Sequence, residues 1–163
     1  ESTMEVEMQI KGLMVDPVTN MPIVILKDAS ESRVLPIWVG IFEANAIALE
    51  VEEIAVPRPM THDLLRNLLE ALGAKVERVV VTDLRDNTYY ALLHLRVGDS
   101  SIVVDARPSD ALALALRTQA PIFVEEAVLD SADTEGGESS SDAERLRKWF
   151  ENLDPDEFSK YEM

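Results

Sequence analysis

A buried strand joins a helix in the stretch Val103-Val104-Asp105-Ala106-Arg107-Pro108-Ser109-Asp110-Ala111-Leu112. The apolar residues predict a strand that ends at Asp105. Pro108 suits the first position of a helix, where its missing N–H group needs no partner. Asp110 then lies in the first helical turn, where the helix dipole stabilises a carboxylate. Two carboxylates and a guanidinium therefore fall within a strand-to-helix junction, a common place for a functional site.

A second junction has the same pattern in Pro57-Arg58-Pro59-Met60-Thr61-His62-Asp63. Thr61 is the expected N-cap residue, because its hydroxyl can accept a backbone N–H of the first turn. His62 and Asp63 then open the helix. Both junctions thus combine an Arg-Pro pair with an acid at the start of a helix, which indicates a role beyond packing.

The composition limits the chemistry. The chain has 163 residues, of which 47% are hydrophobic, and this is sufficient for one domain with a sizeable core. It contains no cysteine, which excludes disulfides, thiolate catalysis and cysteine-ligated zinc. The net charge is −16, so nucleic acid is repelled at long range, and phosphate chemistry would need a local arginine cluster or a divalent metal. We expect a cytoplasmic protein with no membrane contact, because no apolar run approaches the roughly 20 residues of a membrane span.

The hydrophobic pattern predicts an α+β fold, in which three main helices pack on an antiparallel-rich mixed β-sheet. Pro36 places the third strand at an edge or a bulge. The expected strands are residues 5–15, 22–27, 33–39, 75–82, 88–97, 101–105 and 121–124. The expected helices are residues 41–53, 61–72 and 108–118, with a further helical turn at 125–129 and a turn at 83–87.

The chain divides into three regions. Residues 5–129 form the body, and residues 130–142 are rich in Ser, Gly and acid, which is typical of a flexible linker. Residues 143–163 form a helical tail, in which Leu146, Trp149, Phe150 and Leu153 share one apolar face.

The candidate site residues come from the two junctions and from the start of the first helix. His62, Asp63, Asp105 and Asp110 are candidate catalytic groups. Asp63, Asp105, Asp110 and Glu43 are candidate ligands for Mg or Mn, which prefer carboxylate oxygens. Arg58 and Arg107 are candidate phosphate-binding residues. The alternative is structural, since Asp63 and Asp110 can cap helices and Arg107 can pair with a neighbouring acid. No glycine-rich motif for an organic cofactor is present.

Several of these segments resemble the bifunctional nuclease (BFN) domain family. They are Ile10-Lys11-Gly12-Leu13, Val24-Ile25-Leu26-Lys27, Leu35-Pro36-Ile37-Trp38-Val39-Gly40 with Glu43-Ala44, Arg58-Pro59 with Thr61-His62-Asp63-Leu64, and Asp105-Ala106-Arg107-Pro108-Ser109-Asp110-Ala111. The resemblance covers roughly residues 5–129. It implies an α+β fold, a small cytoplasmic bacterial protein, and cleavage of DNA and RNA.

The residues and the resemblance lead to three hypotheses about function. The first is a nuclease that hydrolyses phosphodiester bonds of DNA or RNA with a divalent metal. The second is a non-catalytic binding or regulatory module that recognises an anionic ligand or a protein partner through Arg58 and Arg107. The third is an interaction protein whose oligomer interface buries the two junctions. We expect a homo-oligomer, with a dimer as the first expectation.

Overall fold

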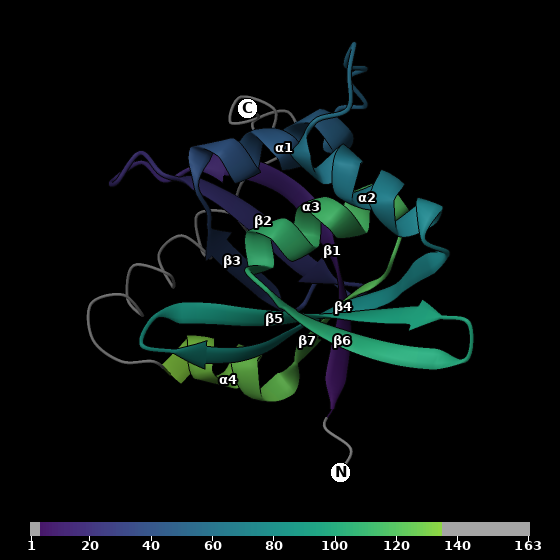
Figure 1. Ribbon diagram of the computed structural model, residues 1–163. Helices are drawn as coiled ribbons and strands as arrows, with labels where there is room; N and C mark the ends of the chain where they lie inside the picture. The colour runs from purple at the N-terminus through teal and green to yellow at the C-terminus, as the bar shows by residue number, and fades with distance from the viewer. Residues whose placement is uncertain (1–3, 135–163) are drawn as a thin grey trace.

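The computed structural model describes residues 4–134 (Figure 1). Seven strands and four helices follow one another along this part of the chain. In chain order they are β1 (Glu5–Val15), β2 (Pro22–Asp28), β3 (Val34–Trp38), α1 (Ile41–Val51), α2 (Thr61–Ala71), β4 (Ala74–Arg85), β5 (Thr88–Val97), β6 (Ser100–Ala106), α3 (Pro108–Thr118), β7 (Ile122–Glu125) and α4 (Glu126–Thr134).

All seven strands form one sheet in the order β3-β2-β1-β7-β4-β5-β6. Neighbouring strands are antiparallel except for β4 and β7, which are parallel. The chain makes a meander from β1 to β3 and another from β4 to β6, and the short strand β7 then joins the two halves. The predicted α+β fold with a mixed, mostly antiparallel sheet is confirmed. Pro36 lies in the edge strand β3, as expected of a residue without a backbone N–H group.

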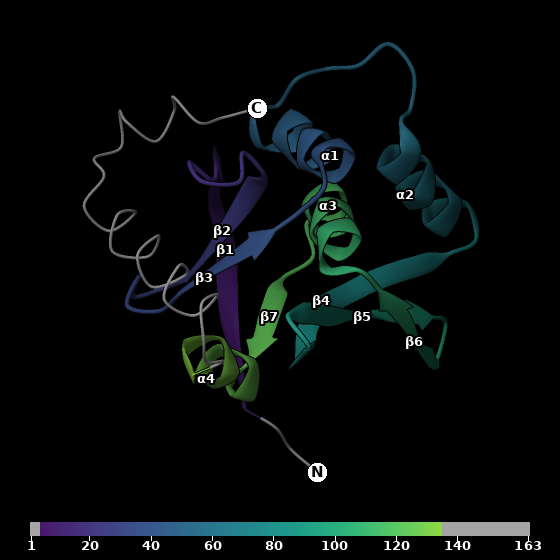
Figure 2. The same ribbon diagram turned by 90° about the vertical axis from the view of Figure 1, so that its left-hand side faces the viewer.

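The helices form two layers around the sheet (Figures 1 and 2). α1, α2 and α3 cover one face, and α4 packs on the other against β4 and β7. α3 lies at the centre of its layer and buries all five residues from Ala111 to Ala115. It packs against α1, α2, β4 and β5, which explains why its sequence alternates alanine and leucine: the small side chains allow close approach, and the leucines fill the core.

Some element boundaries differ from the expected ones. β4 continues to Arg85, because Asp86 and Asn87 have φ angles of 52° and 62° and make a two-residue hairpin turn in place of the expected longer turn. Met60, not Thr61, is the N-cap residue of α2. α4 extends to Thr134, past the expected start of the linker at residue 130. The rest of the linker and the expected tail helix lie outside the described residues.

None of the helices between residues 4 and 134 has the length and apolar character that would let it cross a membrane.

Candidate functional site

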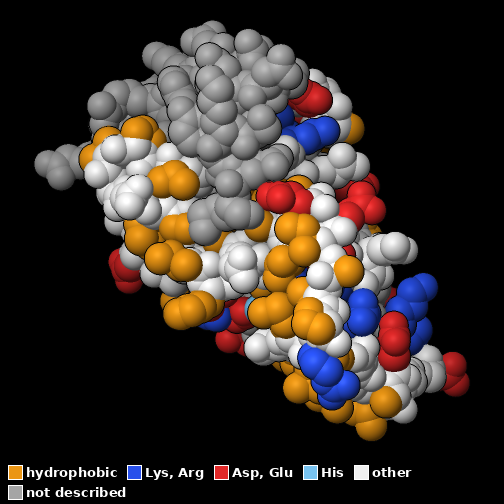
Figure 3. All heavy atoms as spheres, turned by 90° about the horizontal axis from the view of Figure 1, so that it is seen from above, with side chains coloured by type: hydrophobic (Ala, Val, Ile, Leu, Met, Phe, Trp, Pro, Cys, Tyr) orange, Lys and Arg blue, Asp and Glu red, His pale blue; other side chains and the backbone are white. Residues whose placement is uncertain are grey.

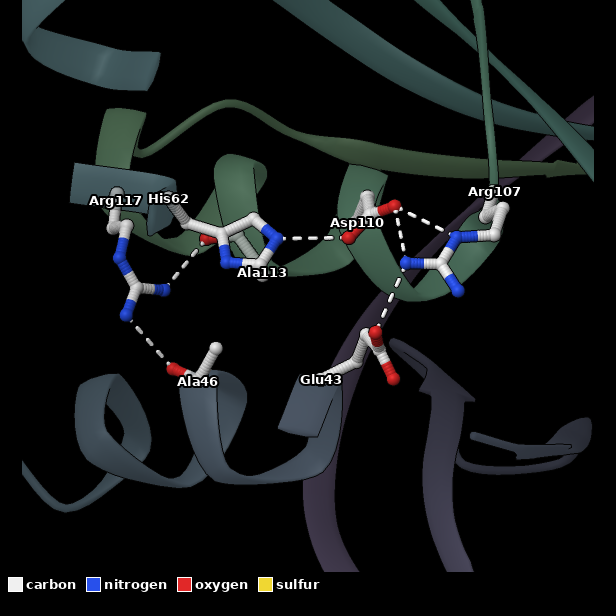
Figure 4. A network of polar contacts seen from close by, with 7 residues as sticks. All are labelled: Glu43, Ala46, His62, Arg107, Asp110, Ala113 and Arg117. Carbon is white, nitrogen blue, oxygen red and sulfur yellow. Dashed lines mark hydrogen bonds and ion pairs between the residues drawn. The ribbon is translucent and has the colours of Figure 1, made fainter. Parts of the chain in front are cut away.

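The two helix-start junctions meet in the fold (Figure 4). His62 in the first turn of α2 and Asp110 in the first turn of α3 are 2.9 Å apart, measured from Nε2 to Oδ1. The imidazole is buried, at 8% exposure, so it sits in a site from which most water is excluded. The residues that share a pattern in the sequence are therefore partners across 48 positions of the chain.

Arg107 extends this contact to a third helix. It is the N-cap residue of α3, and its Nε donates to Asp110 Oδ2 at 2.9 Å. Its Nη2 lies 2.8 Å from the same oxygen and donates to Glu43 Oε2 in α1 at 3.0 Å. Hydrogen bonds to Glu43 and Asp110 raise the pKa of Arg107, so the guanidinium stays charged. Gly40 makes room for Glu43, because a Cβ at this position would collide with the Glu43 carboxylate.

A second ion pair holds α2 in place beside this network. Arg117 Nε donates to Asp63 Oδ1 at 2.7 Å, and the Arg117 side chain is only 1% exposed. Its two Nη atoms donate to the carbonyls of Ala113 and Ala46, at 3.0 and 2.9 Å. The pKa of Asp63 is lowered chiefly by the hydrogen bond from the Met60 N–H and, to a smaller extent, by the hydrogen bond and charge of Arg117. In this fold Asp63 therefore caps α2 and anchors it to α3, while its candidate catalytic role stays a prediction.

Nothing in the sequence pattern singles out Arg117. An arginine in the last turn of a helix is typical of an exposed residue that offsets the negative end of the helix dipole. Here the side chain turns inward, where it bonds to three different elements. Only the packing of α1 and α2 on α3 reveals this role, because Asp63 and Ala46 are distant in sequence.

A pocket opens beside the network and has a volume of about 330 Å³. Its wall includes residues from the starts of all three helices, among them Glu43, His62, Arg107 and Asp110. Phe42, Leu49 and Met60 supply apolar surface. Because helix N-termini carry partial positive charge and free N–H groups, three of them near one pocket favour an anionic ligand there.

Two expected site residues lie apart from this network. Arg58 is exposed in the segment that connects α1 to α2, and Asp105 is exposed on β6 opposite Leu92. Within residues 4–134 neither forms a hydrogen bond or ion pair with another side chain. Asp105 and Ala106 alternate across the strand, so Asp105 projects from the face opposite the one on which Ala106 meets the core.

The carboxylates do not form a metal-binding group in this arrangement. No set of three or more His, Asp or Glu side chains in the described part of the chain is placed to hold a metal ion. The reason is visible in the contacts: Arg107 lies between Glu43 and Asp110, and Arg117 occupies Asp63. Each of these acids is already neutralised by a guanidinium, which does not fit shared coordination of Mg or Mn. That ligand set stays a prediction, to be tested by metal titration.

Residues 24–136 match the model of the bifunctional nuclease domain. The chain belongs to this family. The matched range includes every member of the network, from Glu43 to Arg117, so the site is part of the family's domain. An uncharacterized protein of Mycobacterium tuberculosis is 41% identical over 162 residues, which is 93% of this chain and 97% of that protein.

Plant proteins share the BFN domain at lower identity. Bifunctional nuclease 2 of Arabidopsis thaliana is 31% identical over 105 residues, 63% of this chain and 32% of the plant protein. Bifunctional nuclease 1 of Oryza sativa subsp. indica is 29% identical over 112 residues, 67% of this chain and 34% of the plant protein. This chain therefore spans about a third of the length of those plant nucleases.

Proposed function

We propose that this BFN-domain protein hydrolyses phosphodiester bonds of DNA or RNA in the pocket beside His62. The observation that carries the proposal is the 2.9 Å contact between His62 Nε2 and Asp110 Oδ1 at the pocket wall. A buried histidine paired with a carboxylate is a recurrent arrangement for proton transfer, because the carboxylate orients the ring and stabilises the imidazolium.

His62 has the hydrogen-bonding capacity that this role requires. With Nε2 bonded to Asp110, the other ring nitrogen, Nδ1, makes no hydrogen bond to any residue between 4 and 134. Nδ1 can accept a proton from a water molecule that attacks phosphorus. The imidazolium can then give the proton to the leaving oxygen as the P–O bond breaks, so that the imidazole is restored.

Arg107 supplies the phosphate contact in this proposal. Its Nε and Nη2 bond to carboxylates, whereas Nη1 makes no hydrogen bond within the described residues (Figure 4). The side chain is 64% exposed, so a phosphate can reach this free donor from the pocket. The starts of α1, α2 and α3 add positive potential where charge develops in the transition state.

The names of the plant relatives point in the same direction. The Arabidopsis and rice proteins are called bifunctional nucleases, and the domain that they share with this chain contains the network. The proposal carries the nuclease activity over to this chain on that basis and on the His62–Asp110 geometry.

A non-catalytic module that binds an anionic ligand is the second candidate. It is favoured by Arg107, which two carboxylates already hold in place, and by the lack of a three-ligand metal group within residues 4–134. In this candidate the pocket binds phosphate or a carboxylate through Arg107 without turnover. Binding without cleavage distinguishes it from the nuclease.

The test is cleavage of single-stranded DNA and RNA by the purified full chain. Each assay runs with Mg, with Mn and with chelator, beside Asp110→Asn and the control Asp99→Asn, in which an exposed hairpin aspartate is changed. We expect wild-type cleavage that falls on the order of 100-fold in Asp110→Asn and is unchanged in Asp99→Asn. Equal rates in all three proteins would contradict the proposed site. Phosphate binding without cleavage by the wild type would favour the second candidate. Activity that chelator abolishes would support the expected metal.

A further inference from the structure

The two edges of the sheet are protected to different degrees. β3, at one edge, has five residues and carries Pro36, a residue that natural edge strands use against pairing. β6, at the other edge, has seven residues and contains neither proline nor a basic residue. No strand between residues 4 and 134 pairs with its outer side, so its outer backbone groups are available to another strand.

The side chains of β6 are unusually apolar for an exposed edge. Ile102, Val103 and Val104 are consecutive and are 43%, 53% and 39% exposed. Ile102 and Val104 share the face of their β5 neighbours Leu95 and Leu93, which is the face that α3 covers. An edge of this kind is a template for strand addition and would favour aggregation if it stayed uncovered.

A second exposed apolar surface lies on the same side of the molecule. α2 exposes Leu64, Leu65 and Leu68 to solvent, and its C-cap residue Leu72 adds to them, with exposed fractions from 40% to 75%. These residues share one face, and the residue of α2 that is buried is His62. α2 and β6 both lie at the right-hand side of Figure 2, and Figure 3 shows hydrophobic side chains spread over the helix layer.

We propose that β6 pairs with β6 of a second copy of this chain, antiparallel and centred on Val103, to form a continuous sheet across a two-fold axis. The axis of such a pair is perpendicular to the sheet, so both helix layers lie on the same side. On that side α2 packs over α3 and β4, two strands in from the new contact, so its leucines flank the contact between the two copies of β6. The proposal does not depend on the nuclease activity.

The β6 sequence favours a second copy as the occupant because it is self-complementary in this register. Centring on Val103 places Ile102 opposite Val104 and Ser101 opposite Asp105, so apolar groups meet apolar groups and the carboxylate meets a hydroxyl. The two adjacent registers give less favourable cross-strand side-chain pairs. Centring on residue 102 places Asp105 opposite Asp99, two like charges, and centring on residue 104 places Asp105 opposite Val103.

The first test is the mass of the full chain in solution, by light scattering and sedimentation at several concentrations. We expect a dimer, and we expect Val103→Lys to raise its dissociation constant at least about tenfold, because two lysines then meet at the axis. The matched control is Val18→Lys, which changes a valine that is 74% exposed in the β1–β2 turn and should leave the dimer intact. Circular dichroism checks that both variants fold.

The second test uses the absence of native cysteine. Val103→Cys keeps the size of the side chain and places one thiol at the axis, and Val18→Cys is the control. We expect mild oxidation to link two Val103→Cys chains much faster than two Val18→Cys chains. A wild-type monomer throughout the micromolar range, as when another part of the chain or a different protein covers β6, would overturn the proposal. So would an oligomer that Val103→Lys leaves unchanged, or equal linking of the two cysteine variants.

Discussion

At the scale of single residues, the site depends on which acid faces which arginine. The Asp110 carboxylate is hydrogen-bonded to His62 and Arg107. The Asp63 carboxylate accepts hydrogen bonds from Arg117 and from the Met60 N–H. Both aspartates lie in the first turn of a helix within the same sequence pattern, but their side chains contact different parts of the fold. Asp110 lies at the pocket and Asp63 in the packing between helices, so their substitutions should separate activity from stability.

Replacing Arg117 should destabilise the fold strongly. Arg117→Met removes a cation that is 1% exposed and leaves Asp63 and the Ala46 carbonyl without their partner. Breaking one side of a buried ion pair costs about 3–5 kcal/mol. Urea unfolding at pH 7 should show a loss of this order. An exposed control, Arg96→Met, should cost far less, because its pair with Glu77 is at the surface. Similar losses in the two variants would contradict the buried role of Arg117.

The Asp63 carboxylate should also contribute to the acid side of the stability profile. Its folded pKa lies below the ordinary value of 3.8, so its contribution is fully present above about pH 4 and is lost as pH falls through the folded pKa. The free energy of unfolding should therefore differ between wild type and Asp63→Asn at pH 7, and the difference should shrink below pH 4. A difference that stays constant from pH 7 to pH 3 would show that the carboxylate charge is not involved.

At the scale of elements, α2 is the least anchored helix beside the site. Its buried residue is His62, while α3 buries eight of its residues. We expect the amide hydrogens of α2 to exchange with solvent faster than those of α3 in wild type, and faster still in Asp63→Asn, which weakens the link to Arg117. Hydrogen–deuterium exchange by mass spectrometry measures both. Equal protection of α2 and α3 would mean that α2 is held by contacts other than those of His62 and Asp63.

The elements themselves were largely predictable from the sequence. Alternation, Gly73 and Gly98 at positive φ, and Pro108 at a helix start are local signals, and each of them marks an element boundary in the fold. The pairing of β7 between β1 and β4 was not predictable, because four residues carry no information about their neighbours. The long-range contacts of Arg117 and the meeting of His62 with Asp110 were not predictable for another reason, because each joins residues at least 48 positions apart. Arg58 and Asp105 belong to the same two sequence motifs, but the fold leaves both outside the network.

At the scale of the whole molecule, the net charge of −16 opposes the approach of a polyanion. If the proposed function is correct, screening should help catalysis. We expect kcat/KM for single-stranded DNA to rise as monovalent salt increases from about 0.01 to about 0.1 M, the range in which the Debye length falls from about 30 to about 10 Å. For a small phosphodiester substrate with a single negative charge, kcat/KM should depend much less on salt. A steady fall in kcat/KM with salt would instead indicate a basic surface that steers the substrate.

The catalytic role proposed for His62 is tested most directly by comparing the two histidines of the chain. His62 contacts Asp110 at the pocket, and His94 lies on β5, where burial lowers its pKa and Val103 is its neighbour across the strands. The measurement is the single-turnover cleavage rate of single-stranded RNA and DNA by wild type, His62→Ala and His94→Ala, prepared identically. We expect a loss on the order of 100-fold or more in His62→Ala and an unchanged rate in His94→Ala. Equal rates in the three proteins would contradict this role.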